Sequence, residues 1–132
     1  MPNWCLNSIY IEGPEKEIEK FEEYVSTNKS TFSLHKIIPM PDKEKENWYE
    51  WCWENWGTKW EIDERYIEKS GGNRELQYMF DTAGAPPVPV YEHLVNKFPK
   101  LIIEWFSQDE SEEEGHTLPE LSPSIFILEK EK

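Results

Sequence analysis

The stretch WCLNSIYIE, residues 4–12, runs directly into GPEKEIEKFEEYV, residues 13–25, and these two segments decide the fold. Residues 4–12 alternate as a strand does, and one face carries Cys5, Asn7, Ile9 and Ile11. Gly13 and Pro14 stop the strand, and proline is tolerated in a first helical turn. Behind them, apolar residues recur at helical spacing, at Ile18, Phe21, Tyr24 and Val25. The sequence therefore predicts a strand followed by an amphipathic helix that lies on a sheet.

A hairpin is predicted further along the chain. Residues 59–68 and 75–83 have strand composition and are joined through Gly71-Gly72-Asn73, where glycine supplies positive φ without steric cost. On the second of these strands, one side carries Leu76, Tyr78 and Phe80.

A helix and a strand complete the predicted order. The proline-rich residues 83–89 form a turn, residues 90–98 a short helix, and residues 101–107 an apolar strand. This order is the βαββαβ order of the ferredoxin-like sandwich, an α+β fold with two helices on one face of an antiparallel sheet. We expect one domain over residues 1–132, with a possible C-terminal edge strand over residues 124–129.

A tryptophan-rich segment is inserted between the first helix and the hairpin. Most of the seven tryptophans lie in residues 48–60. Asp42 is a candidate cap for a helix that Gly57 ends, and one helical face would carry Trp48, Trp51, Cys52 and Asn55 or Trp56. We therefore predict a helical insertion whose indoles form either part of the core or a recognition surface.

Charge and composition narrow the partners and the compartment. Against 27 acidic residues there are 14 basic ones, for a net charge of −13, and without a basic stripe direct nucleic-acid binding is not expected. An acidic surface serves solubility or meets a basic protein. With two separated cysteines, no signal-peptide pattern and no membrane-length apolar run, we expect a cytoplasmic protein with reduced thiols.

Five strings occur together in order between Met1 and Leu101: MPNWCLNSIYIEG, IPMP, NWGTKW, DTAGAPPVPV and FPKL. In this set the chain resembles the YubB ferredoxin-like domain family of conjugative plasmids and bacteriophages. The resemblance implies a ferredoxin-like fold and a mobile-element setting, and it implies no iron–sulfur cluster. Two departures stand out: Gly84 replaces the tryptophan of a TAW-x-PP string, and an acidic run and a proline-rich stretch replace the family's last motif.

The string NWGTKW supplies the first candidate site. Trp56 and Trp60 flank Gly57 and could form a recognition pocket with Asn55, Lys59 and the preceding Trp53, because indoles attract cations and an asparagine both donates and accepts hydrogen bonds. The alternative is structural, with asparagine and glycine ending the helix and the indoles filling the core. Of the two, the structural interpretation is favoured.

The acidic loop over residues 108–116 is the second candidate. It contains a dense run of carboxylates: Asp109, Glu110, Glu112, Glu113 and Glu114. Such a run is most simply a solvated loop. Carboxylates spaced like phosphates can also occupy the basic groove of a nucleic-acid enzyme.

No catalytic, metal or cofactor site is predicted. Zinc needs about four ligands at set spacing, and His35, His93, His116, Cys5 and Cys52 form no such pattern. A Cys52–His93 nucleophile lies in no known motif.

The leading functional hypothesis is a non-enzymatic accessory protein of a phage or plasmid. It would bind a basic or nucleic-acid-handling protein and inhibit a host defence complex, as an anti-CRISPR protein does. The alternative is a small-ligand or peptide-binding module that uses the tryptophan-rich cluster. Exposed strand edges could also pair two copies of the chain.

Overall fold

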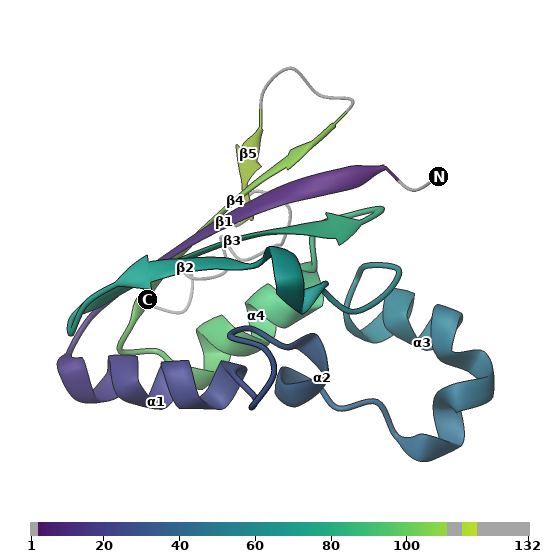
Figure 1. Cartoon of the computed structure of the whole chain (residues 1–132), viewed down its shortest axis with the longest axis horizontal. Coiled ribbons are helices and arrows are strands. Elements are labelled where there is room, and N and C mark those ends of the chain that lie inside the picture. The colour runs from purple at the N-terminus through teal and green to yellow at the C-terminus, as the bar shows by residue number, and fades with distance from the viewer. Residues whose placement is uncertain (1–2, 111–114, 119–132) are drawn as a thin grey trace, which may run out of the picture.

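The computed structural model describes residues 3–110 and 115–118 and has an α+β fold, with an antiparallel sheet on one side and several helices on the other. Figure 1 shows the helices gathered beneath the sheet. In chain order the elements are β1 (Trp4–Glu12), α1 (Glu15–Val25), α2 (Leu34–Ile37), η1 (Asp42–Asn47), α3 (Trp48–Asn55), η2 (Glu64–Tyr66), β2 (Glu68–Gly71), β3 (Glu75–Ala83), α4 (Val88–Lys97), β4 (Ile102–Asp109) and β5 (His116–Thr117).

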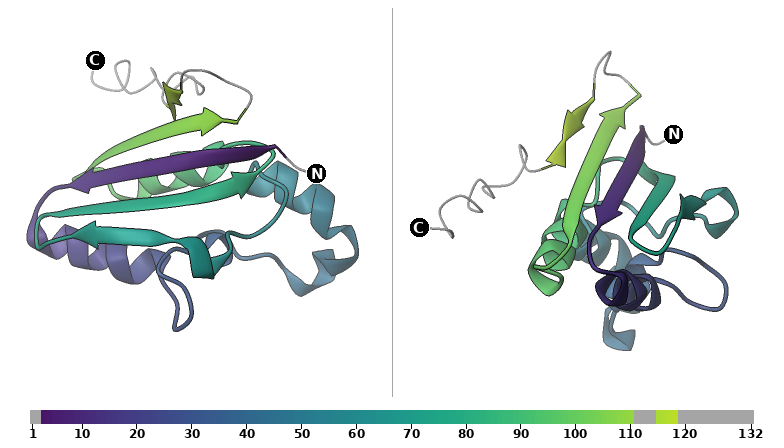
Figure 2. Two further views of the ribbon diagram at one scale, coloured as in Figure 1. Left: turned by 45° about the horizontal axis from the view of Figure 1, so that its top comes forward. Right: turned by 90° about the vertical axis from the view of Figure 1, so that its left-hand side faces the viewer.

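The sheet is built around its first strand. Its order is β2-β3-β1-β4-β5, and every neighbouring pair is antiparallel. β1 pairs along its whole length with β3, from Trp4 opposite Ala83 to Glu12 opposite Glu75. The two edges are short, since β2 has four residues and β5 has two (Figure 2).

The core lies between the sheet and the helices, as the alternating pattern predicts. Cys5, Ile9 and Ile11 of β1 are at most 1 % exposed, and the predicted inward face of β3 is buried with them. The helices add their apolar stripes to this layer, and α1 buries Ile18, Phe21 and Val25. No helix among the described residues covers the opposite face of the sheet (Figure 2), where Leu6, Asp81 and Phe106 are exposed.

The predicted strand over residues 59–68 is wrong for most of its length. Only Glu68 belongs to a strand, and the residues before it form turns and the short η2 helix. The reason is local, because the acidic side chains of this segment cap backbone N–H groups. Asp63 accepts from the backbone N–H of Arg65 (3.0 Å), and Glu61 caps the start of α2. Asp63 keeps an extended backbone, but the 3-10 helix η2 that it caps interrupts the run of extended residues that a ladder requires.

The tryptophan-rich insertion is helical but is not one continuous helix. A 3-10 helix, η1, runs over Asp42–Asn47, and the α-helix begins only at Trp48. The predicted cap at Asp42 is wrong, since the cap position is Pro41 and no side chain caps there. Gly57 has a φ of +80° just beyond α3, as expected for the residue that ends this helix. In Figure 1 the insertion extends past the end of the sheet.

Two further boundaries differ from expectation. α4 begins two residues earlier than predicted, at Val88, and β4 continues to Asp109. The first residue of the predicted acidic run is therefore part of the sheet. Glu112, Glu113, Glu114 and the predicted edge strand over residues 124–129 lie outside the described residues. Among the residues that are described, no helix has the length and apolar character needed to cross a membrane.

Candidate functional site: a pocket between Trp4 and Trp60

The tryptophan-rich cluster divides into core and surface residues. Trp56 is only 3 % exposed, donates its indole Nε1–H to the backbone oxygen of Ile38 (2.8 Å) and meets Trp51 edge to face. Trp56 is therefore a core residue and does not line a recognition surface. Trp48 and Trp60 are 44 % and 38 % exposed. On the predicted helical face, Trp51 and Cys52 are buried, whereas Trp48, the first residue of α3, is exposed.

The other predicted residues of the string have structural partners. Asn55 donates its side-chain amide to the backbone oxygen of Trp51 (3.0 Å), so it completes its own helix end. Trp53 and Lys59 pack against Gly84, where an added Cβ would lie 2.9 Å from the Trp53 ring and 3.2 Å from the Lys59 stem. Gly84, with a φ of +91°, leaves room for these side chains.

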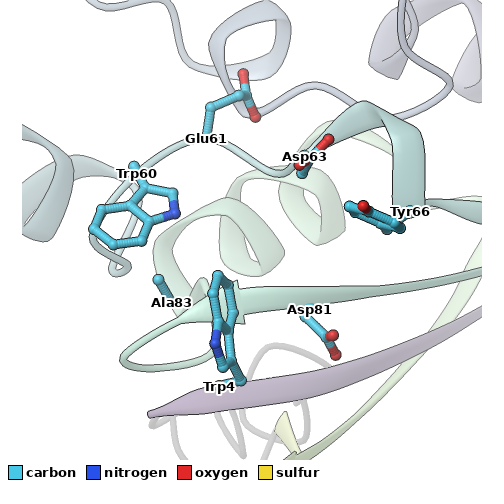
Figure 3. Close-up of a pocket in the computed structure, with 7 residues that line it drawn as sticks. All are labelled: Trp4, Trp60, Glu61, Asp63, Tyr66, Asp81 and Ala83. Atoms are coloured by element: carbon cyan, nitrogen blue, oxygen red, sulfur yellow. The ribbon is translucent and has the colours of Figure 1, made fainter. Parts of the chain in front are cut away.

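Residues 60–66, which follow α3 in the chain, form one wall of a surface pocket. The pocket has a volume of about 490 Å³ and is lined by Trp4, Trp60, Glu61, Asp63, Tyr66, Asp81 and Ala83 (Figure 3). These residues come from β1, β3 and the loop that replaces the predicted strand. Aromatic side chains make its walls, and none of the described residues that line it is basic.

Trp4 and Trp60 both line this pocket and meet edge to face. Their ring centroids are 6.3 Å apart and their planes meet at 70°, an edge-to-face arrangement. Both rings are 38 % exposed, so each keeps a large part of its surface toward solvent. Two hydrogen bonds hold the Trp60 loop, because the backbone N–H of Lys59 (3.0 Å) and the hydroxyl of Thr58 (2.6 Å) both donate to the backbone oxygen of Ala83.

Two of the three acidic side chains in the pocket are already engaged. Glu61 accepts hydrogen bonds from the backbone N–H groups of Leu34 (2.8 Å) and His35 (2.9 Å) at the start of α2. Figure 3 shows its carboxylate turned away from Trp4. Asp63 pairs with Arg65 at 2.8 Å. This hydrogen bond from Arg65 is also the main reason why the pKa of Asp63 is lowered.

Asp81 is the acidic residue of the pocket that remains available. Within residues 3–110 and 115–118 its side chain makes no ion pair or hydrogen bond. Partial burial raises its pKa, and the negative charge of Glu110 raises it further. Its carboxylate is thus short of a positive partner, which is a common property of binding sites.

The predicted acidic site adjoins this pocket. A second hollow of about 420 Å³ shares Trp4 and Asp81 with the first, and Asp109 and Glu110 line it together with Leu6 and Gln108. Two hydrogen bonds join Glu110 to the backbone of Trp4. The backbone N–H of Glu110 donates to the backbone oxygen of Trp4 (3.0 Å), and the Glu110 carboxylate accepts from the backbone N–H of Trp4 (3.1 Å). The structure therefore brings the described part of the acidic run beside the exposed indoles.

Trp4 and Asp81 were not candidates from sequence, whereas Trp60 was considered as part of the first candidate site. Trp4 and Asp81 lie on the solvent-facing side of their strands, and the alternation of β1 and β3 contains that information. Trp60 belongs to the NWGTKW string. Their proximity could not be predicted, because it depends on a loop conformation that the strand pattern of residues 59–68 concealed.

The cysteines and two of the histidines considered as reactive groups from the sequence are buried or hydrogen-bonded in the structure. Cys5 and Cys52 are buried thiols that form no disulfide, and burial raises the pKa of Cys52 to about 11, with a smaller contribution from Glu61. His93 forms a 2.7 Å hydrogen bond with the hydroxyl of Tyr24, and the backbone N–H of Met40 donates to His35 Nδ1 (3.1 Å). No group of three or more His, Cys, Asp or Glu in the described part of the chain is placed to hold a metal ion.

No protein-family model matches the chain, and the comparisons with curated proteins and with solved structures find no match either.

Proposed function

We propose that this protein is a binding module for a basic protein partner, and that its binding surface is the helix-free sheet face around Trp4, Asp81 and Glu110. The single observation that carries this proposal is the junction of the exposed Trp4 indole with the acidic side chains of Asp81 and Glu110 at one end of that face. Aromatic residues supply most of the binding energy in protein interfaces, and complementary charge supplies orientation and speed.

We further propose that the fold is ferredoxin-like with a helical insertion. The strand order β2-β3-β1-β4, antiparallel throughout, supports this assignment, since a split βαβ unit repeated twice produces that order. The insertion η1 and α3 and the additional strand β5 are decorations of that plan. Membership of the YubB family remains a proposal based on the five sequence strings.

The biological setting follows from that resemblance. We propose an accessory protein of a phage or plasmid whose partner handles nucleic acid in the host, and which it inhibits by occupying a basic surface. The overall charge of −13 supports this role, because a groove built for phosphates also attracts carboxylates.

Affinity capture from host lysate, followed by binding measurements on the captured protein, tests this function. We expect a basic partner, an affinity that falls as salt rises from about 0.05 M to about 0.5 M, and displacement of nucleic acid from the partner. Reversing Glu112, Glu113 and Glu114 to Lys should weaken binding and reduce its salt dependence.

A matched control reverses three exposed acids of α1, Glu15, Glu19 and Glu23, and so changes the net charge by the same amount on the helical side of the sheet. The proposal requires the first variant to weaken binding more than the control. Equal effects of the two variants would show that overall charge acts without a defined surface.

A second candidate function is a small-ligand or peptide-binding module, which the aromatic pocket of about 490 Å³ favours. Quenching of tryptophan fluorescence by metabolites or nucleotides, lost in Trp60→Ala, would support it. If no metabolite, nucleotide or short arginine peptide binds the chain, this candidate is rejected.

A further inference from the structure

The pocket between Trp4 and Trp60 combines two features that attract the same kind of ligand. Its aromatic walls include two partly exposed indoles, and the Asp81 carboxylate lies on the opposite side of Trp4 from Trp60, without a positive partner among the described residues. Indole faces attract cations within about 6 Å of the ring, and a carboxylate pairs with the same group. Figure 3 shows Asp81 between the Trp4 and Tyr66 side chains.

We propose that this pocket binds an arginine side chain of the protein partner, with the guanidinium against the indole of Trp4, Asp81 as its counter-ion and Trp60 as the adjoining wall. The proposal rests on the proposed function, because it names the group by which a basic partner is recognised. Asp81 and the two indoles are therefore the specificity-determining residues of the surface.

One arginine of the chain itself already lies against an aromatic ring and a carboxylate at this pocket. Arg65 lies over the ring of Tyr66, with its guanidinium carbon 5.3 Å from the ring centroid, and it pairs with Asp63 at 2.8 Å. An aromatic ring, a carboxylate and a guanidinium thus form one internal unit. Trp4, Trp60 and Asp81 repeat the ring and the carboxylate on the other side of the pocket, and the guanidinium is the component that a partner would supply.

Arginine fits this site better than lysine for two reasons. The guanidinium is planar and weakly hydrated, so it stacks on an indole and leaves water at a smaller cost than an ammonium does. It can also donate two parallel hydrogen bonds to one carboxylate. The volume of about 490 Å³ is large for one side chain, so we expect the adjoining peptide backbone to enter as well.

Short peptides test the proposal without the natural partner. The probe is acetyl-Gly-Arg-Gly-amide, compared with the same peptide carrying lysine or citrulline, the neutral isostere of arginine. The readout is the set of indole N–H signals in two-dimensional NMR spectra of the full chain. We expect the arginine peptide to shift the Trp4 and Trp60 signals and to leave Trp48 unchanged, with citrulline binding at least about tenfold more weakly.

Two variants and a control locate the site. Asp81→Asn keeps the shape of the side chain and removes its charge, and Trp60→Ala removes one wall; both should abolish the preference for arginine over citrulline. Trp48→Ala is the matched control, because it deletes an equally exposed indole outside the pocket, and it should bind as the unmodified protein does. Thermal melting of each variant verifies that it is folded.

The possible results separate this proposal from the proposed function. Equal binding of arginine and citrulline peptides, or equal binding of arginine and lysine peptides, would overturn the arginine assignment. If a basic partner is nevertheless captured in a salt-dependent way, the general function stands and only its recognition element is wrong. Arginine-selective binding that survives in Asp81→Asn would also overturn the assignment of Asp81 as counter-ion.

Discussion

The side-chain oxygen of Asn7 accepts a hydrogen bond from the indole Nε1–H of Trp105 at 2.9 Å, and both residues are 0 % exposed. Asn7 lies on β1 and Trp105 on β4, so the bond joins two neighbouring strands on the core side of the sheet. The amide of Asn7 also donates to the hydroxyl of Thr82 on β3 (2.9 Å). One polar side chain thus links the three central strands within the core.

Replacing Asn7 by alanine should destabilise the fold by about 2–3 kcal/mol, because the buried indole N–H of Trp105 would lose its acceptor. Urea denaturation measures this change. Ser8→Ala is the control, since Ser8 neighbours Asn7 but faces the helix-free side of the sheet, and it should change stability by no more than about 0.5 kcal/mol. Similar losses for both variants would contradict the role assigned to the Asn7 bond.

Trp56→Ala should cost about 3–5 kcal/mol, because it removes a buried indole together with its hydrogen bond to Ile38. Trp48→Ala deletes the same side chain from an exposed position of α3 and should cost less than about 1 kcal/mol. Thermal melting of the pair therefore separates core from surface within the tryptophan-rich cluster. A loss below about 1 kcal/mol for Trp56→Ala would refute its core assignment.

Gly57→Ala should destabilise the chain by at least about 2 kcal/mol, since the residue has a φ of +80° and an added Cβ would lie 2.6 Å from the Pro89 ring. Gly72→Ala makes the same substitution where nothing lies within 4 Å and φ is not positive. That variant should be neutral or slightly stabilising. The difference in melting temperature between the two isolates the backbone requirement at the end of α3.

The pair of Tyr24 and His93 should make stability depend on pH. Burial lowers the pKa of His93 below its ordinary value of 6.5, and the charge of Lys97 lowers it further. The folded chain then binds fewer protons than the unfolded chain, so stability is lost as pH falls through the unfolded pKa. Between about pH 7.5 and about pH 5.5, the unmodified protein should lose stability relative to His93→Gln. Parallel pH profiles for the two proteins would count against this role of His93.

The alternation of apolar residues predicted the central part of the fold. In β1 and β3 every second residue faces the core, and that pattern identified both strands and their inward faces, including Ile9 and Tyr78. Such prediction works where one face of a strand is buried along its whole length, because burial then selects a single register.

The same reasoning failed at residues 59–68, where side-chain caps decide the conformation. Glu61 belongs to a local sequence of strand-like composition, but its carboxylate binds the start of α2, 27 residues earlier in the chain. Composition carries no information about such a partner. The indoles of Trp48 and Trp56 likewise have the same chemistry, and only the place where α3 begins decides which of them is buried.

The cap that Glu61 provides for α2 has a consequence for the rate of recognition. With the hydrogen bonds of Lys59 and Thr58 to Ala83, it anchors the Trp60 loop on both sides of the indole. A loop held in this way has little conformational entropy left to lose when a partner arrives. Association should then be limited by diffusion and charge steering rather than by loop closure, and mutations of the pocket should act mainly by shortening the lifetime of the complex.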